Sequence, residues 1–168
     1  MDGTCGMNSP SNLRIEVVRT HESVSCLEIE ARMPSEVKAI SPLVDRVVRL
    51  IGESQWMPGD ELHVEMAVRE AVKNAVVHGN RLDPSKLVQI RCRCEVGKGV
   101  SIVVKDEGQG FNPEAVPDPL APENLEAEHG RGILLMKFWM DEVSFEQGGT
   151  EVHMLKRTSR EQKTEAAK

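Results

Sequence analysis

Apolar and polar residues alternate in six short segments of the chain, and a period of two is typical of β-strands with one buried face. The segments are residues 12–19, 25–31, 87–95 and 100–106 and the two arms of 141–157. A turn near His21 separates the first two, and glycine-containing turns separate the members of the later pairs. Three β-hairpins are therefore predicted.

Apolar residues three and four positions apart predict helices. The first helix lies within residues 35–51 and contains Pro42, so it begins either before this proline or at it, after a separate turn. The second runs from Asp60, a residue type that often caps helix N-termini, to His78. Gly79 is expected to end it in the left-handed conformation.

A long segment without apolar periodicity precedes the third predicted helix, which is short and apolar and covers residues 130–140. Residues 112–128 contain four prolines, and an irregular loop of this length is typical of a lid or binding element. Residues 1–11 and 158–168 are expected to be disordered, which leaves residues 12–157 as a single domain. Hairpins combined with three helices predict an α+β fold, a two-layer sandwich with helices on one face of a mixed, mainly antiparallel sheet.

Composition and charge narrow the function classes. The 168-residue chain has a net charge of -6, which argues against a nucleic-acid-binding surface because such surfaces cluster Lys and Arg. No apolar stretch reaches the roughly 20 residues that span a bilayer, and the N-terminus lacks the features of a signal peptide. Four cysteines without C-x-x-C spacing indicate neither a disulfide framework nor a zinc site, and Cys92 and Cys94 are expected to be buried on one strand face. We therefore expect a cytoplasmic protein.

The second predicted helix has two polar stripes on an otherwise apolar surface. One stripe is spaced for ion pairs and indicates a solvated face; it consists of Glu65, Arg69 and Lys73. The other consists of His63, Glu70, Asn74 and His78. Glu70 and Asn74 lie one turn apart, so a carboxylate and an amide project together. Such oxygen ligands suit Mg²⁺, and the carboxylate is also suited to act as a general base. Hydrogen-bonded core residues are the structural alternative.

Two glycine-containing segments follow. The strand over 100–106 runs into Asp106-Glu107-Gly108-Gln109-Gly110-Phe111, where a carboxylate can accept a hydrogen bond and the glycines let a flat ligand approach. Gly130-Arg131-Gly132 opens the third helix ahead of Ile133, and free backbone N–H groups at a helix start suit phosphates. A surface turn and a plain loop-to-helix joint are the respective structural alternatives.

The order of these segments resembles the GHKL ATPases, the superfamily of gyrase, the ninety-kilodalton heat-shock chaperones and the histidine kinases. The N, G1 and G2 boxes of that superfamily are similar to residues 70–79, 106–111 and 130–136. A closer resemblance, over about residues 33–157, is to the bacterial anti-sigma-factor serine kinases; residues 70–78 and 136–143 carry it.

The resemblance implies binding of ATP and Mg²⁺. It implies that Asn74 coordinates the metal beside Glu70, that Glu70 acts as the base for the attacking hydroxyl, and that Asp106 accepts the adenine amino group. Further nucleotide contacts are implied for His78, Gly108, Gly110, Phe111, Gly130, Arg131, Gly132 and Ile133. The chain departs from some relatives in one respect, because their arginine before the first glycine of the G2 box is absent here and Arg131 lies between the glycines.

The resemblance also implies protein partners. These are an anti-sigma factor antagonist, phosphorylated on Ser or Thr, and a sigma factor; a homodimer is compatible with the resemblance, and neither nucleic acid nor membrane is an expected partner. Two alternatives stay open. Instead of an anti-sigma-factor kinase, the chain could be the catalytic domain of a sensor histidine kinase, or a non-catalytic module that binds a sigma factor and uses ATP as a structural ligand.

Overall fold

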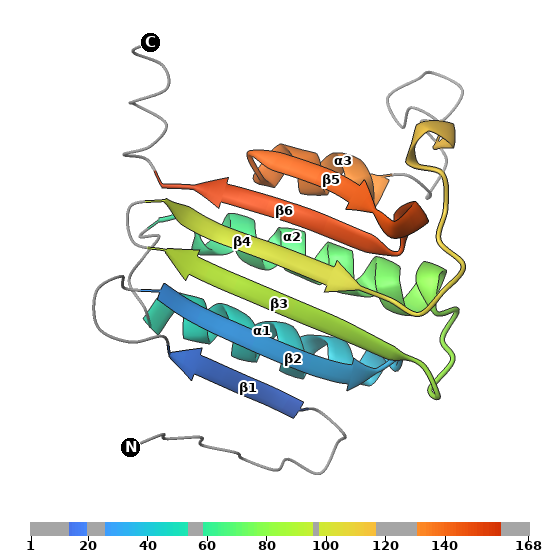
Figure 1. Cartoon of the computed structure of the whole chain (residues 1–168), viewed down its shortest axis with the longest axis horizontal. Coiled ribbons are helices and arrows are strands. Elements are labelled where there is room, and N and C mark those ends of the chain that lie inside the picture. The colour runs from blue at the N-terminus through green and yellow to red at the C-terminus, as the bar shows by residue number, and fades with distance from the viewer. Residues whose placement is uncertain (1–13, 20–25, 54–58, 96–97, 117–130, 159–168) are drawn as a thin grey trace.

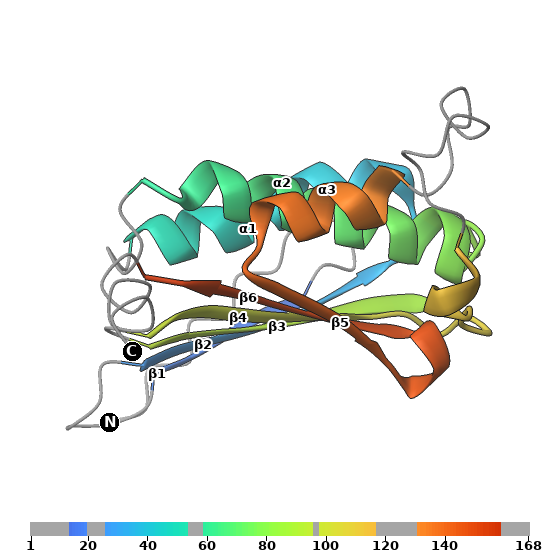
Figure 2. The same ribbon diagram turned by 90° about the horizontal axis from the view of Figure 1, so that it is seen from above.

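The computed structural model describes residues 14–19, 26–53, 59–95, 98–116 and 131–158. Within them the protein has two layers, a twisted sheet and a layer of helices on one of its faces (Figures 1 and 2). The strands are β1 (Arg14–Arg19), β2 (Cys26–Pro34), β3 (Leu87–Glu95), β4 (Gly99–Lys105), β5 (Glu142–Glu146) and β6 (Glu151–Arg157). Their order in the sheet is β1-β2-β3-β4-β6-β5, and each described pairing is antiparallel. The predicted α+β fold class is confirmed.

Among the described residues, three α-helices form the second layer (Figure 2). They are α1 (Val37–Glu53), α2 (Glu61–Asn74) and α3 (Arg131–Trp139). The helix α2 continues into a π-helical turn, η1 (Ala75–Gly79), and two short 3₁₀ turns are η2 (Pro113–Ala115) and η4 (Gln147–Gly149). The described elements therefore match the predicted helices and hairpins to within a few residues.

The core lies between the sheet and the helices, because alternate residues of the central strands face the helical layer. Cys92 and Cys94 of β3 are buried in it, as predicted, and burial raises the pKa of the Cys94 thiol to about 12. Other fully buried side chains include Leu43 and Val47 of α1, Val68 and Val72 of α2, and Ile90 and Ile102 of the sheet. This single layer of aliphatic contacts holds α1 and α2 against the strands.

The helix α1 begins at Val37 and runs through Pro42, so the alternative start at the proline is wrong. Pro42 has no backbone N–H, so the helix lacks the hydrogen bond that this position would otherwise donate to the carbonyl of Lys38. Ala39 and Ile40, just before the proline, are buried against the core. Their burial favours the helical start that places them there.

The ends of α2 differ from the sequence prediction. Asp60 occupies the N-cap position, but its carboxylate makes no capping hydrogen bond and lies 3.0 Å from the ring of His63. Gly79 lies within the π-helical turn without a positive φ, and the left-handed residues are Arg81 (φ 56°) and Leu82 (φ 60°). The predicted left-handed stop at Gly79 is therefore wrong, and the absence of a side chain at Gly79 instead leaves space for the carboxylate of Asp106.

Several predictions fall outside the described residues. They are the disordered ends, the turn near His21, most of the proline-rich loop, and Gly130. The division into one domain with two disordered ends therefore stays a prediction. Among the helices that the structure describes, none has the length and apolar character needed to cross a membrane.

Candidate functional site

A cavity of about 340 Å³ lies where α2, α3 and the ends of β4 and β6 meet. This volume is within the range of small-molecule sites, about 300–1,000 Å³. The predicted site residues that line the cavity are Glu70, Asn74, His78, Asp106, Gly110, Phe111, Gly132 and Ile133. Gly108 and Arg131 are absent from the lining, and Gly130 lies outside the described residues. Three segments distant in the chain therefore share one cavity.

The start of α3 packs directly on the polar stripe of α2. A Cβ added at Gly132 would lie 2.3 Å from Oε1 of Glu70 and 2.8 Å from the side-chain nitrogen of Asn74. Only glycine therefore lets the helix start approach this closely while the carboxylate and the amide keep their positions. The Glu70 side chain is mostly buried, with 18% of its surface exposed.

The carboxylate of Asp106 lies at the other end of the lining, beside the π-helical turn. The carboxylate accepts a 2.8 Å hydrogen bond from the backbone N–H of Gly108, and the backbone N–H of Asp106 donates to the carbonyl of Thr150. A Cβ on Gly79 would lie 2.4 Å from the carboxyl carbon, which explains a glycine at this position. Burial raises the pKa of Asp106, and the Gly108 hydrogen bond opposes that shift.

The turn between β5 and β6 closes the cavity from the sheet side. Gly110 has a φ of 72°, and a Cβ there would lie 2.1 Å from the carbonyl oxygen of Gly148. Phe111 donates its N–H to the same carbonyl at 3.0 Å and packs edge-to-face on Phe145, with ring centroids 5.3 Å apart. A Cβ on Gly149 would lie 2.3 Å from the carbonyl oxygen of Phe111. The glycine segment after β4 is therefore seated on this turn.

Sequence reasoning missed the lining residues that the final hairpin contributes. These are Phe145, Gly149, Thr150 and Val152. In the sequence, the paired glycines of the turn indicate only a hairpin. The residues reach the cavity because β6 pairs with β4, a non-sequential neighbour, and no short sequence motif specifies that pairing.

Lys73 also lines the cavity, although the sequence placed it in a solvated ladder of ion pairs. Its Nζ lies 3.7 Å from Oε1 of Glu70. The remainder of the ladder is present, because Arg69 bonds to Glu65 at 2.9 Å, and it extends to Asp45 of α1 at 3.0 Å. Lys73 departs from the prediction because residues three apart on a helix are neighbours, so its long side chain can contact Glu70 of the second polar stripe.

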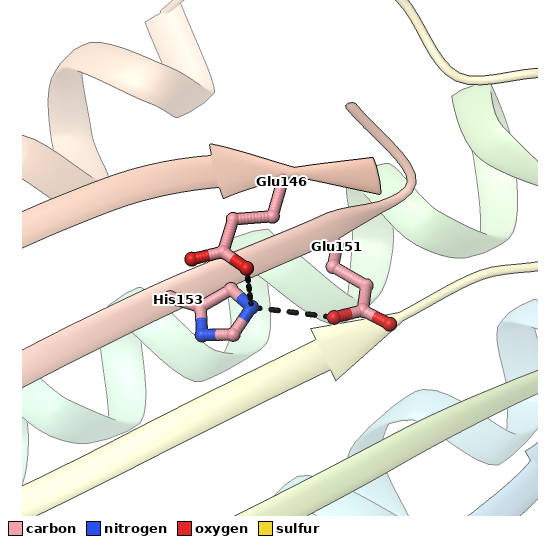
Figure 3. Close-up of side chains that lie close together, drawn as sticks. All are labelled: Glu146, Glu151 and His153. Carbon is pink, nitrogen blue, oxygen red and sulfur yellow. Dashed lines mark hydrogen bonds and ion pairs between the residues drawn. The ribbon is translucent and has the colours of Figure 1, made fainter. Parts of the chain in front are cut away.

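A second group of ionisable side chains lies on the sheet face that points away from the helices, near the β5–β6 turn (Figure 3). The ring of His153 lies 3.3 Å from a carboxylate oxygen of Glu151 and 3.5 Å from one of Glu146. Lys105 donates to the other oxygen of Glu151 at 2.7 Å, and mainly this hydrogen bond lowers the pKa of Glu151. Because these charges partner one another, we interpret the group as an ion-pair network.

The family model described as the histidine kinase-like ATPase domain matches residues 33–156. The chain belongs to this family. The matched residues of this histidine kinase-like ATPase domain run from the end of β2 to β6 and include every residue that lines the cavity.

Curated relatives place the domain among regulators of sigma factors. The anti-sigma F factor of Anoxybacillus flavithermus is 38% identical over 103 residues, which cover 58% of this chain and 70% of that protein. The serine-protein kinase RsbW of Staphylococcus epidermidis is 30% identical over 142 residues, which cover 80% of this chain and 89% of that protein. The resemblance inferred from the sequence is therefore confirmed for the superfamily and for the anti-sigma-factor kinase subgroup.

Proposed function

We propose that this chain is an anti-sigma regulatory kinase that binds Mg²⁺-ATP in the cavity. It transfers the γ-phosphate to a Ser or Thr of an anti-sigma factor antagonist, and it also binds a sigma factor. One observation carries the proposal: the carboxylate and amide of α2, the carboxylate after β4 and the start of α3 line a single cavity. Relatives named as an anti-sigma factor and as a serine-protein kinase support this class of activity. Such a protein works on cytoplasmic ATP, so we place it in the cytoplasm.

The base of the nucleotide lies at the Asp106 end in this proposal. A buried carboxylate is suited to accept a hydrogen bond from the amino group of adenine, because the low local dielectric strengthens that bond. Gly110 lines this part of the cavity, and the apolar surfaces of Phe111, Ile133 and Met136 are available to pack against the ring. Gly108 contributes indirectly, because its N–H holds the Asp106 carboxylate.

The phosphates lie at the Glu70 end, where the donor set fits Mg²⁺. An amide oxygen and a carboxylate are hard ligands, and a magnesium ion fills its other positions with water and phosphate oxygens. The close approach of Gly132 keeps both side chains at the cavity wall. Asn74 would hold the ion, with Glu70 beside it, and Mg²⁺ when bound neutralises charge on the phosphates. The positive end of the α3 dipole would favour the same negative charge, and Arg131 at that helix start would add to it.

Glu70 then serves as the base. Its carboxylate accepts the proton of the Ser or Thr hydroxyl while the hydroxyl oxygen bonds to the γ-phosphorus. The bond from that phosphorus to the bridging oxygen of ADP breaks, and ADP leaves. Positioning and charge neutralisation supply most of the catalysis in phosphoryl transfer, so the cavity needs no covalent intermediate on the protein.

Two measurements test the proposal. Calorimetric titration with Mg²⁺-ATP should show binding by the wild-type chain, and absence of any affinity would reject the nucleotide site. Labelled ATP should then phosphorylate a bound anti-sigma factor antagonist, and the label should be stable in acid, as expected for phosphoserine. An acid-labile label would instead indicate histidine-kinase chemistry.

The base is tested with Glu70→Gln and a matched control. Glu70→Gln should keep ATP affinity and lose phosphotransfer by about 10²–10⁴-fold, the usual contribution of a general base. Glu65→Gln, on the same helix but bonded to Arg69, is the control and should keep activity. If the wild type binds ATP and a sigma factor without labelling any antagonist it binds, the chain is a non-catalytic binding module.

A further inference from the structure

Asn80 is the residue directly after the π-helical turn, and its side chain is fully buried. Its amide nitrogen donates to Oγ of Ser35 at 2.6 Å and to the carbonyl of Leu87 at 2.9 Å. Its amide oxygen accepts the backbone N–H of Glu107 at 2.8 Å. One buried amide therefore joins the end of β2, the start of β3 and the segment after β4 to the end of the α2 region.

The bond to Glu107 holds the residue next to Asp106. The carboxylate of Glu107 adds a second connection, because it accepts the N–H of Leu87 at 2.8 Å. Gly79, beside Asn80, packs against the Asp106 carboxylate, and a Cβ on Gly108 would lie 2.2 Å from the carbonyl oxygen of Gly79. The pair formed by Gly79 and Asn80 thus contacts the carboxylate of Asp106 and holds the backbone of the two residues that follow it.

We propose that Asn80 is a positioning residue that sets the preference of the cavity for adenine over guanine nucleotides. The inference rests on the proposed function, because it requires ATP in this cavity. Adenine presents an amino donor where guanine presents a carbonyl oxygen. A carboxylate held in place accepts from the first and repels the second, so the discrimination depends on how firmly the segment after β4 is held.

The amide of Asn80 is suited to this role because its oxygen and its nitrogen bond to different segments. The amide oxygen holds the Asp106 segment, whereas the amide nitrogen holds the two strand ends. The two functions can therefore be separated by substitution. Removing the oxygen should affect nucleotide discrimination, and removing a partner of the nitrogen should affect stability alone.

The experiment compares Asn80→Ala with Ser35→Ala in the full chain. Both remove a hydrogen bond of the same buried network, but Ser35→Ala leaves the bond to Glu107 in place. For each variant, calorimetry gives the dissociation constants of Mg²⁺-ATP and Mg²⁺-GTP, and thermal unfolding gives stability. We expect the ratio of the GTP constant to the ATP constant to fall about tenfold in Asn80→Ala and to stay at the wild-type value in Ser35→Ala.

A third variant keeps the test decisive if Asn80→Ala does not fold. Asn80→Asp retains an oxygen acceptor for the N–H of Glu107 and loses the two amide donors, so it should be less stable while it keeps the wild-type ratio. A wild-type ratio in Asn80→Ala, or a lowered ratio in Asn80→Asp, overturns the inference. Absence of ATP binding by the wild-type chain would instead reject the proposed function, so the two failures are distinguishable.

Discussion

Gly132→Ala should separate the stability of this protein from its activity. The added Cβ would lie 2.3 Å from Oε1 of Glu70, whereas ordinary van der Waals contact begins near 3.4 Å. The carboxylate oxygen must therefore move by about 1 Å, and the side-chain nitrogen of Asn74, at 2.8 Å, must also shift. Both atoms end flexible side chains, so the fold can absorb the methyl group by rotating them away.

The stability of the variant should be unchanged or slightly raised. Gly132 is the second residue of α3 and has no positive φ, and replacing a helical glycine with alanine gains up to about 1 kcal/mol. The catalytic geometry should suffer instead. A misplacement of about 1 Å at a reacting group can cost on the order of 10²-fold in rate, so we expect phosphotransfer to fall by about that factor.

The assay pairs thermal unfolding with labelling of the antagonist at saturating Mg²⁺-ATP. Gly52→Ala is the matched control, because Gly52 also lies in a helix, and a Cβ there has no atom within 4 Å. It should gain similar helix stability and keep full activity. Wild-type turnover by Gly132→Ala would refute the reasoning that this close approach positions Glu70.

Three further outcomes follow from the structure. Asp106→Asn should weaken ATP binding and yet stabilise the ligand-free protein at neutral pH. Burial raises the pKa of Asp106, so the contribution of its neutral carboxyl group to folding stability is lost as the pH rises through that pKa. In chemical denaturation at a series of pH values, the stability gain of the variant over wild type should therefore grow above about pH 3.8. Lys105→Met removes one of the two partners of Glu151, which keeps His153, and should cost about 1 kcal/mol in urea unfolding. Gly110→Ala should cost more than Gly148→Ala in the same assay, because both residues are left-handed but only Gly110 faces a backbone oxygen.

Much of the fold could be predicted because its signals are local. The period of two in the strands and the spacing of three and four in the helices depend on neighbouring residues, so β3, β4, α2 and α3 lie close to their predicted ranges. The start of α1 was harder to predict, because burial of Ala39 and Ile40 outweighs the local effect of Pro42. Tertiary packing decided that helix end, and a single sequence does not display it.

The site was predictable only in part, because some of its contacts also depend on tertiary packing. Glu70 and Asn74 share a helix face by spacing alone, so their neighbourhood follows from the sequence. The sequence carries no signal for the role of Asn80, because a lone asparagine after a helix is typical of a turn, and its partners Ser35 and Glu107 are 45 and 27 positions away. Hydrogen bonds over such separations depend on which strands pair, and pairing is a property of the whole sheet.

Three glycines link local sequence to long-range contacts, because each is visible in the sequence and marks a place where distant segments meet. Gly132 faces the α2 carboxylate, Gly79 faces the carboxylate after β4, and Gly149 faces the backbone of Phe111. Each allows two distant segments to approach more closely than any side chain would permit, and only one of the three has a positive φ. Gly149 therefore needs both its conformational freedom and its missing volume, whereas missing volume alone accounts for Gly79 and Gly132. When neither a cap nor a turn requires a glycine in a helical segment, and the glycine stands near candidate site residues, it therefore indicates that a distant segment packs closely there.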